Sequence, residues 1–251
     1  MGTVAPVTPL LETRAISKRF GGLEAVSGVD LRLERGEVRA LIGPNGAGKT
    51  TLVGLISGRL QPTAGEVRLA GRDITRLPPW ERAGLGIVYT FQVTSIYQRL
   101  SVHDNVALAA QRRRLRTALD WLTLDRSVVD STVNAALAQV GLRHLHERRA
   151  GELPYGHQRV LEVAMALALE PELLILDEPT QGLAGDEIES LCQLVRRIAG
   201  TTTVLLIEHN MEVVLALAGR VTVMDRGRIL AEGTPEEIAA HPEVQRVYLG
   251  R

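Results

Sequence analysis

Short apolar runs recur along the chain and predict strands that are buried inside the fold. The clearest runs consist mostly of Val, Ile, Leu and Ala, and they cover residues 38–42, 173–176 and 203–207. The first run is followed by apolar residues with the spacing of one helix face, Leu52, Leu55 and Ile56. That spacing predicts a helix over 49–60. Strand and helix alternate again from 169 to 224, which is typical of an α/β fold with a parallel sheet.

The pattern predicts a single domain over residues 1–251 that is organised in three regions. Residues 12–91 and 169–224 are expected to form one α/β core, and part of the first stretch alternates as a half-exposed strand pair does. Residues 92–168 are mainly helical in pattern. The tail, 225–251, has the pattern of a short hairpin followed by a capped helix.

Composition narrows the classes of protein that the chain can belong to. Its 251 residues include 29 basic and 29 acidic residues, so the formal charge is zero and nothing suggests a nucleic-acid partner. The only cysteine, Cys192, excludes an intrachain disulfide, and we expect a small buried side chain in a reducing compartment. Residues 1–10 lack the pattern of a secretory signal, and no apolar run approaches the roughly 18 residues that span a bilayer. We therefore expect any membrane pathway to belong to other chains.

One segment matches the phosphate-loop pattern G-x-x-x-x-G-K-[ST] at every fixed position, and its residues are Gly43, Pro44, Asn45, Gly46, Ala47, Gly48, Lys49 and Thr50. It lies between a predicted strand and a predicted helix, where backbone N–H groups and the helix dipole attract phosphate. Lys49 is expected to reach the β and γ phosphates, and Thr50 to ligate magnesium, with Thr51 beside it in the nucleotide site. The sequence therefore predicts binding of a nucleoside triphosphate, and it leaves kinases, GTPases, helicases and transport ATPases open.

Two acidic residues end the apolar run at 173–176. A buried parallel strand places such residues at its carboxyl edge, so Asp177 is predicted to hold magnesium and Glu178 to polarise an attacking water. Pro179 follows directly and supports a second interpretation, in which the acidic pair caps a following helix. The residues of this motif do not separate the two interpretations.

The segment Leu153-Pro154-Tyr155-Gly156-His157-Gln158-Arg159, with a helical pattern after it, resembles the signature motif of ATP-binding cassette (ABC) ATPases, usually written L-S-G-G-Q. The resemblance implies a phosphate-loop ATPase core with an antiparallel β lobe and a helical lobe, and ATP and Mg²⁺ as cofactors. It also implies roles at further positions. Those roles are contacts to nucleotide from Tyr155, Gly156 and His157, adenine stacking by Phe20, contact to magnesium and to the attacking water by Gln92, and contact to the γ phosphate by His209.

The residue types and their places after strands support some of these roles more strongly than others. Gln92 has an amide that can reach both magnesium and water, and His209 follows the apolar strand 203–207, so it emerges at the carboxyl edge of the sheet. A lone histidine after a strand more often has a structural role than a functional one. The other motifs in the chain favour a functional role for His209. Phe20 taken alone is more often a core residue than a stacking platform.

Two positions depart from the family pattern. The signature serine, which in the family contacts ATP bound by the opposite subunit, is replaced by Pro154, which has neither a hydroxyl nor an N–H group. Proline still suits the start of a helix. In the segment 182–184, which resembles the family's D-loop, Ala184 replaces an aspartate. Both changes remove polar contacts across the expected dimer interface.

Within the family, the chain looks like the ATPase subunits of importers for branched-chain amino acids and for related amides and urea. The likeness rests on residues 19–26, 90–92, 207–211 and a Tyr-Leu-Gly ending. It implies a cytoplasmic, peripheral subunit on the inner membrane that hydrolyses ATP within a head-to-tail dimer of cassettes. Its implied partners are transmembrane permease subunits, a second identical or different cassette and, through the permease, a solute-binding protein.

Two alternatives to the importer remain. The lipopolysaccharide-export ATPase has a similar ending, and a regulatory ATP-binding module would tolerate hydrolysis lost through Pro154 and Ala184. Glu178 and His209 argue against the module, because a pure binder needs neither. A basic cluster, Arg112 to Arg114 with Arg116, is either a solvated helix end or a docking surface for the permease.

Overall fold

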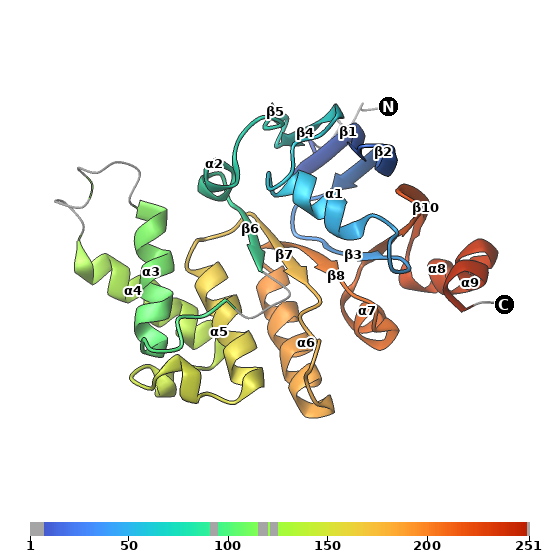
Figure 1. Cartoon of the computed structure of the whole chain (residues 1–251). Helices are drawn as coiled ribbons and strands as arrows, with labels where there is room; N and C mark the ends of the chain where they lie inside the picture. Colours follow the sequence, from blue (N-terminus) through green and yellow to red (C-terminus); the bar gives the residue numbers. More distant parts are fainter. Residues whose placement is uncertain (1–7, 91–94, 115–119, 121–124, 250–251) are drawn as a thin grey trace, which may run out of the picture. The chain divides into compact units, whose positions relative to one another are not determined.

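The structure is a computed structural model of the chain, and it describes residues 8–90, 95–114, 120 and 125–249. The chain divides into two compact units. Unit 1 comprises the residues up to 82 together with those from 199 onward, and unit 2 comprises residues 83–198. Figure 1 shows the helices and strands of both units.

Unit 1 contains an antiparallel sheet with the strand order β2-β1-β4-β5, whose members are β1 (Leu11–Phe20), β2 (Leu23–Leu33), β4 (Ala64–Leu69) and β5 (Arg72–Asp73). The central strand, β1, pairs with β2 on one side and β4 on the other, so Leu11 lies opposite both Leu33 and Leu69. All three leucines are buried, and they give this sheet an apolar face.

The second set of strands in unit 1 has the order β10-β9-β3-β8, with bounds β3 (Val38–Ile42), β8 (Thr203–Ile207), β9 (Arg220–Asp225) and β10 (Arg228–Gly233). All five residues of β3 are buried, and β3 is parallel to both of its neighbours, β8 and β9. The pairing explains why β3 and β8 are mostly apolar, as is usual for parallel strands that are covered on both faces. The predicted hairpin is present, because β9 and β10 are antiparallel around Arg226 and Gly227, but it begins at Arg220, before the predicted start of the tail at 225.

Helices of unit 1 pack onto this second set of strands, and they are α7 (Met211–Leu217), α8 (Pro235–Ala240) and α9 (Pro242–Leu249). The helix α1 (Lys49–Ile56) contacts β2. One buried cluster joins β3 and β9 to α7, α8 and α9 through Ala40, Ile42, Val214, Ala218, Val221, Val223, Ile238 and Val244. The predicted helix cap is confirmed, because the Thr234 side chain and the Glu237 side chain form a reciprocal capping box at the start of α8.

The predicted helix over 49–60 ends earlier than its pattern suggested. In the structure α1 ends at Ile56, and Ser57 and Gly58, both weak helix formers, follow it. The guanidinium group of Arg82 donates to the carbonyl oxygens of Leu55 and Ile56 at 2.6 and 2.8 Å, so it satisfies the end of the helix. Leu60 therefore belongs to the connection to β4 rather than to the helix.

Unit 2 combines two parallel strands, β6 (Ile87–Thr90) and β7 (Leu173–Asp177), with α3 (Val102–Arg114), α4 (Arg126–Val140), α5 (Tyr155–Leu167) and α6 (Gly185–Ala199). Short 3-10 turns occupy 143–145 and 150–152, and α2 (Pro79–Gly84) spans the boundary between the two units along the chain. The helices α3, α4 and α5 pack against one another, and they carry buried residues such as Val106, Val133 and Leu161. Cys192 on α6 is buried, as predicted.

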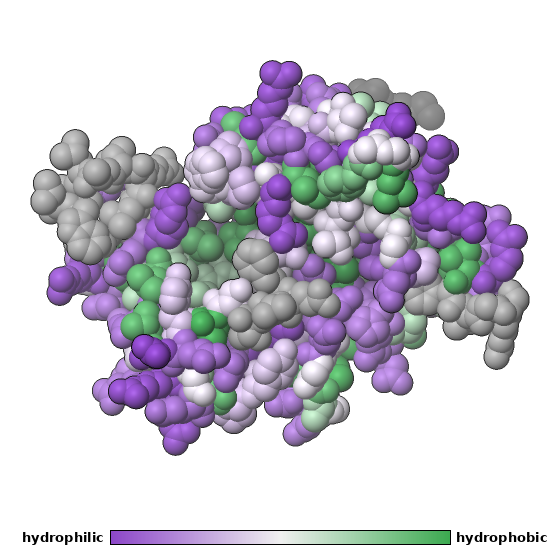
Figure 2. Space-filling view, viewed as in Figure 1, coloured by the Kyte–Doolittle hydropathy of each residue, from purple (hydrophilic) through white to green (hydrophobic). Residues whose placement is uncertain are grey.

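Hydrophilic residues dominate the surface seen in Figure 2. Among the residues that the structure describes, every helix is too short or too polar to cross a membrane.

Candidate nucleotide-binding and hydrolysis residues

The segment 43–50 joins β3 to α1, as the sequence predicted. Gly48 is the N-cap of α1 and has a φ of 99°, a left-handed conformation that glycine adopts without strain. A Cβ atom at this position would lie 2.5 Å from the carbonyl oxygen of Ala25 on β2, so a side chain would displace backbone. The loop therefore lies against β2 at a position that only glycine fills easily.

Positive charge collects where this loop enters α1. The N-cap residue Gly48 provides no side-chain cap and the first turn of α1 has no acidic residue, so the helix dipole is not offset there. Lys49 Nζ donates to the carbonyl oxygens of Gly43 and Pro44 at 2.6 and 3.1 Å, which places a cation on the loop itself. The loop residues Asn45, Gly46 and Thr50 are exposed, Ala47 and Gly43 are buried, and Pro44 and Thr51 are half-buried. This arrangement suits a bound polyphosphate.

His209 lies at the same edge of unit 1 as the phosphate loop. The strand before it, β8, is parallel to β3, and Ile207 pairs with Leu41, so both strands deliver their following residues to one edge. Buried Glu208 accepts hydrogen bonds from the backbone N–H groups of His209 and Asn210 at 3.1 and 3.3 Å. The backbone at His209 is thus fixed while its side chain is exposed. Glu208 was not among the predicted site residues, although a carboxylate directly after the mostly apolar run 203–207 was a signal for it.

Phe20 is the last residue of β1, and its side chain is 47% exposed, so the interpretation as a core residue is wrong. The ammonium group of Lys18 lies 5.2 Å from the centre of its ring. An exposed aromatic ring is what adenine stacking requires, and that role stays a prediction.

In unit 2, Asp177 is the last residue of β7 and is only 7% exposed. Its carboxylate accepts a hydrogen bond from the hydroxyl group of Tyr89, which lies on the neighbouring strand β6. Tyr89 was not among the predicted site residues, although its place three residues before Gln92 was a signal for it. The contact orients the carboxylate that is predicted to hold magnesium.

Glu178 follows Asp177 with a φ of 47°, a left-handed conformation that is strained for a residue with a side chain. Its carbonyl oxygen accepts a hydrogen bond from the Gln181 backbone at 3.1 Å, so the chain turns here. The next helix, α6, begins only at Gly185, so the interpretation of the acidic pair as a helix cap is wrong. Strained backbone is common at functional positions.

The signature segment forms the start of α5. Pro154 is the N-cap residue, with φ −52° and ψ 151°, and it supplies no side-chain cap, so the helix start is retained as predicted. Tyr155 and His157 are exposed and Gly156 is buried. In the segment 182–184, the backbone N–H group of Ala184 donates to the Glu187 carboxylate of α6 at 2.9 Å. Because the donor is the backbone, this contact does not depend on the aspartate that Ala184 replaces.

Two predictions fall wholly or partly outside the described residues. Gln92 lies there, so its contacts to magnesium and water stay predictions. Arg116 of the basic cluster lies there too. Within the described part, Arg113 pairs with Glu170 at 3.3 Å and Arg112 is exposed, near the carboxyl end of α3, where cations are favoured.

The glycine-rich loop between a buried strand and a helix, together with the acidic end of β7, defines a phosphate-loop ATPase. The chain belongs to the ABC transporter family, since the model described as ABC transporter matches residues 26–181. A second model, described as branched-chain amino acid ATP-binding cassette transporter, matches residues 228–251. The chain is therefore a transport ATPase that binds nucleotide and hydrolyses ATP, and the family resemblance stated from the sequence is confirmed.

Individual relatives cover nearly the whole chain. The high-affinity branched-chain amino acid transport ATP-binding protein BraF of Pseudomonas aeruginosa is 40% identical over 96% of this chain and 98% of its own. LivG of Salmonella typhimurium, with the same description, is 41% identical over the same shares. A crystal structure of an ABC transporter cassette in its ADP conformation is 31% identical and matches with a TM-score of 0.85, over 97% of this chain and 99% of that one. These likenesses confirm the predicted α/β cassette fold.

Proposed function

We propose that the chain is the ATP-hydrolysing subunit of an importer for branched-chain amino acids or related amides. The observation that carries the hydrolytic part is the pairing of Leu41 with Ile207, which places the phosphate loop and His209 at one edge of unit 1. A module that only bound ATP would have no use for a histidine at that edge. The solute is inferred from the names of BraF and LivG and from the match at 228–251.

In the proposed mechanism each residue has one task. Lys49 and the loop N–H groups hold the β and γ phosphates, with Phe20 stacking on adenine. Glu178 accepts a proton from the attacking water, Gln92 orients that water, and His209 donates a hydrogen bond to the γ phosphate. The half-buried position of Glu178 and its turned backbone support this assignment, because they hold the carboxylate at the end of a rigid strand.

Magnesium fits the oxygen ligands that the chain offers. The proposed ligands are the Thr50 hydroxyl, the Asp177 carboxylate and the Gln92 amide, all of them hard oxygen donors. The described residues hold no cluster of three or more His, Cys, Asp or Glu side chains that could bind a metal. Proteins commonly bind magnesium through one or two carboxylates together with substrate phosphates. When bound, the ion neutralises charge that develops on the phosphates.

The proposed assembly is a head-to-tail dimer of cassettes on transmembrane permease subunits, at the cytoplasmic face of the membrane. Each ATP would lie between the phosphate loop of one cassette and the α5 start of the other, and a solute-binding protein would act through the permease. Exposure of Tyr155 and His157 at the start of α5 supports this, because residues that meet a partner's nucleotide must be accessible in the single chain.

Uptake by whole cells tests the proposal. Cells that lack this chain are complemented with the wild type or with Glu178→Gln, and uptake of radiolabelled leucine, valine and a short aliphatic amide is measured. We expect wild type to restore uptake of at least one of them and Glu178→Gln to restore none, although both are expressed equally. Normal uptake in uncomplemented cells, with an envelope defect instead, would contradict the importer and favour an export ATPase.

A further inference from the structure

Two charged side chains are buried on α5 just behind the signature residues. Arg159 is 4% exposed and Glu162 is 7% exposed, and Arg159 Nη1 lies 3.0 Å from Glu162 Oε2. They are three residues apart and so share one face of the helix. Burying two charges is costly unless both are well hydrogen-bonded. Neither residue has a task in the proposed mechanism, so the pair needs another explanation.

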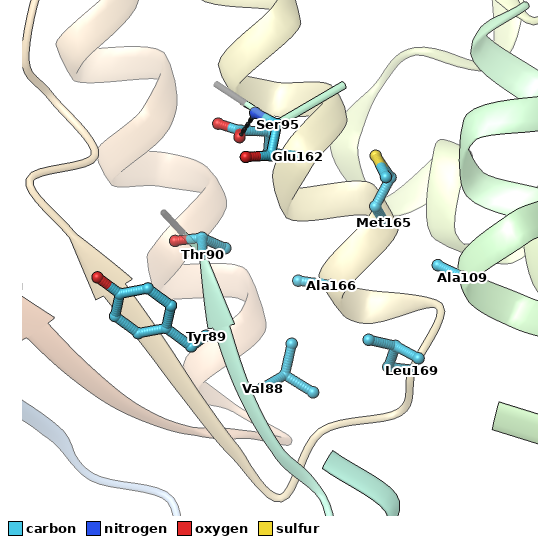
Figure 3. Close-up of a pocket in the computed structure, with 9 residues that line it drawn as sticks. All are labelled: Val88, Tyr89, Thr90, Ser95, Ala109, Glu162, Met165, Ala166 and Leu169. Atoms are coloured by element: carbon cyan, nitrogen blue, oxygen red, sulfur yellow. Dashed lines mark hydrogen bonds between the residues drawn. The ribbon is translucent and has the colours of Figure 1, made fainter. Parts of the chain in front are cut away.

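Glu162 also holds a second part of unit 2. Its Oε1 atom accepts a hydrogen bond from the backbone N–H group of Ser95 at 2.5 Å. Figure 3 shows the two residues together beside a pocket of about 160 Å³ whose other lining is mostly apolar, formed by Val88, Tyr89, Thr90, Ala109, Met165, Ala166 and Leu169. Burial raises the pKa of Glu162, and the hydrogen bonds from Ser95 and Arg159 oppose that rise. Along the chain, Ser95 comes three residues after Gln92.

Arg159 reaches in the other direction, to the signature aromatic. The centre of its guanidinium group lies 5.6 Å from the centre of the Tyr155 ring, a distance at which a cation is attracted to an aromatic face. The same ring borders Gly182, where a Cβ atom would lie only 3.1 Å from Tyr155 Cε1. Tyr155 is 44% exposed, so these contacts decide how the ring is presented.

We propose that Arg159 and Glu162 are a positioning pair that ties the signature ring of Tyr155 to the chain at Ser95. The contacts form one series, from the ring through the guanidinium and the carboxylate to the Ser95 backbone. A displacement of the chain at Ser95 therefore moves Tyr155 with it. The catalytic consequence rests on the proposed function: ATP turnover, which needs both Gln92 and the signature, depends on the pair, whereas ATP binding at the phosphate loop does not.

The experiment measures the environment of Tyr155 directly. The full chain is labelled with 3-fluorotyrosine, and the ¹⁹F signal of Tyr155 is assigned with Tyr155→Phe. Glu162→Gln keeps the size and an acceptor for the Ser95 N–H group but removes the charge that holds Arg159, and Arg159→Lys keeps the charge but loses the planar group. We expect both variants to shift the Tyr155 signal. We also expect kcat for ATP to fall about three- to tenfold, the scale of one such contact, with KM nearly unchanged.

A matched control is Glu243→Gln. Glu243 and Arg246 are also three residues apart on a helix, with a separation of 3.7 Å, but both side chains are exposed, so the change should leave the Tyr155 signal and kcat as in wild type. If neither Glu162→Gln nor Arg159→Lys shifts the signal while their melting temperatures fall, the pair is only a structural ion pair and the proposal is wrong. A shifted signal with unchanged kcat would overturn its catalytic consequence. If both variants shift the signal but the wild-type chain hydrolyses no ATP, the proposed function is overturned and the positioning pair is left intact.

Discussion

Asp177 and Glu178 are adjacent in the chain but differ in environment. Asp177 is buried and accepts the Tyr89 hydrogen bond, which keeps one lone pair engaged and fixes the carboxylate. Glu178 is half-buried on a turn whose left-handed backbone costs about 1–2 kcal/mol for a residue with a side chain. The difference separates a fixed metal ligand from a carboxylate that can accept a proton, as paired acids in hydrolases require.

Pro154 is the residue at which this chain departs most from its family's signature, and Pro154→Ser tests the cost. Serine restores a hydroxyl donor toward the γ phosphate of the partner's ATP and is itself a favoured N-cap residue, so α5 should still form. A hydrogen bond to a charged oxygen is worth about 1.5–3 kcal/mol. We expect ATP-dependent dimerisation to strengthen about tenfold or more and basal ATPase activity to rise.

Dimerisation is followed by light scattering with ATP in the background of Glu178→Gln, which is expected to trap the closed state. Gly156→Asp is the opposing control, because it adds a negative charge where the backbone N–H groups and helix dipole meet phosphate. If Pro154→Ser changes neither ATP-dependent dimerisation nor basal ATPase activity while Gly156→Asp abolishes both, the signature acts through its backbone alone. The proline would then cost no contact.

At the scale of elements, the apolar runs were sufficient to predict β3, β7 and β8, because a parallel strand covered on both faces has an almost continuous apolar sequence. The hairpin of β9 and β10 and the capping box of α8 were predictable for a different reason, because both depend on residues that are close together in the sequence. The end of α1 was not, because it depends on Arg82, which is 26 residues further along the chain than Ile56.

The partners that the sequence analysis overlooked have a common cause. Tyr89 meets Asp177 across two strands, and Glu162 accepts from the Ser95 backbone, which is 67 residues away along the chain, so both contacts arise only when unit 2 folds. A charged residue within an apolar pattern indicates that a buried charged pair is present, but the pattern does not show which residue is its partner. Phe20 shows the converse, because nothing in its neighbouring sequence separates an exposed strand end from a core position.

Arg82 provides a test at this scale. Its side chain is fully buried and donates to carbonyl oxygens at the end of α1 and to those of Thr75 and Leu77, which lie just before α2. Burial lowers the pKa of Arg82 to about 10, so its guanidinium group stays charged at neutral pH. Arg82→Met should destabilise the fold by about 2–4 kcal/mol, because the Leu55 and Ile56 carbonyl oxygens lose their donors in a buried place. Urea unfolding measures the change.

The control for this prediction is Arg76→Met, an exposed arginine close by in the chain, which should cost about 0.5 kcal/mol or less. Equal losses of stability in the two variants would mean that Arg82 does not hold the end of α1. A small loss in both would show that water satisfies the carbonyl oxygens as well as the guanidinium does.

At the scale of the whole molecule, family membership was predictable from the order of motifs along the chain, which runs from the phosphate loop through the signature and the acidic strand to His209. The transported solute was not, because the motifs that can be recognised along the chain concern ATP and not a solute. The match at residues 228–251 and the names of the relatives supply the inference of a branched-chain amino acid, and the uptake experiment decides it.

The most direct test of the account is phosphate release from MgATP by wild type and Glu178→Gln at saturating nucleotide. If Glu178 accepts the proton of the attacking water, the variant should still bind MgATP, and its rate of phosphate release should fall by about a hundredfold or more, the scale of a lost general base. Lys49→Ala, which removes the loop cation, should lose binding as well. Turnover by Glu178→Gln near that of wild type would contradict the central claim that this chain hydrolyses ATP through the carboxylate after β7.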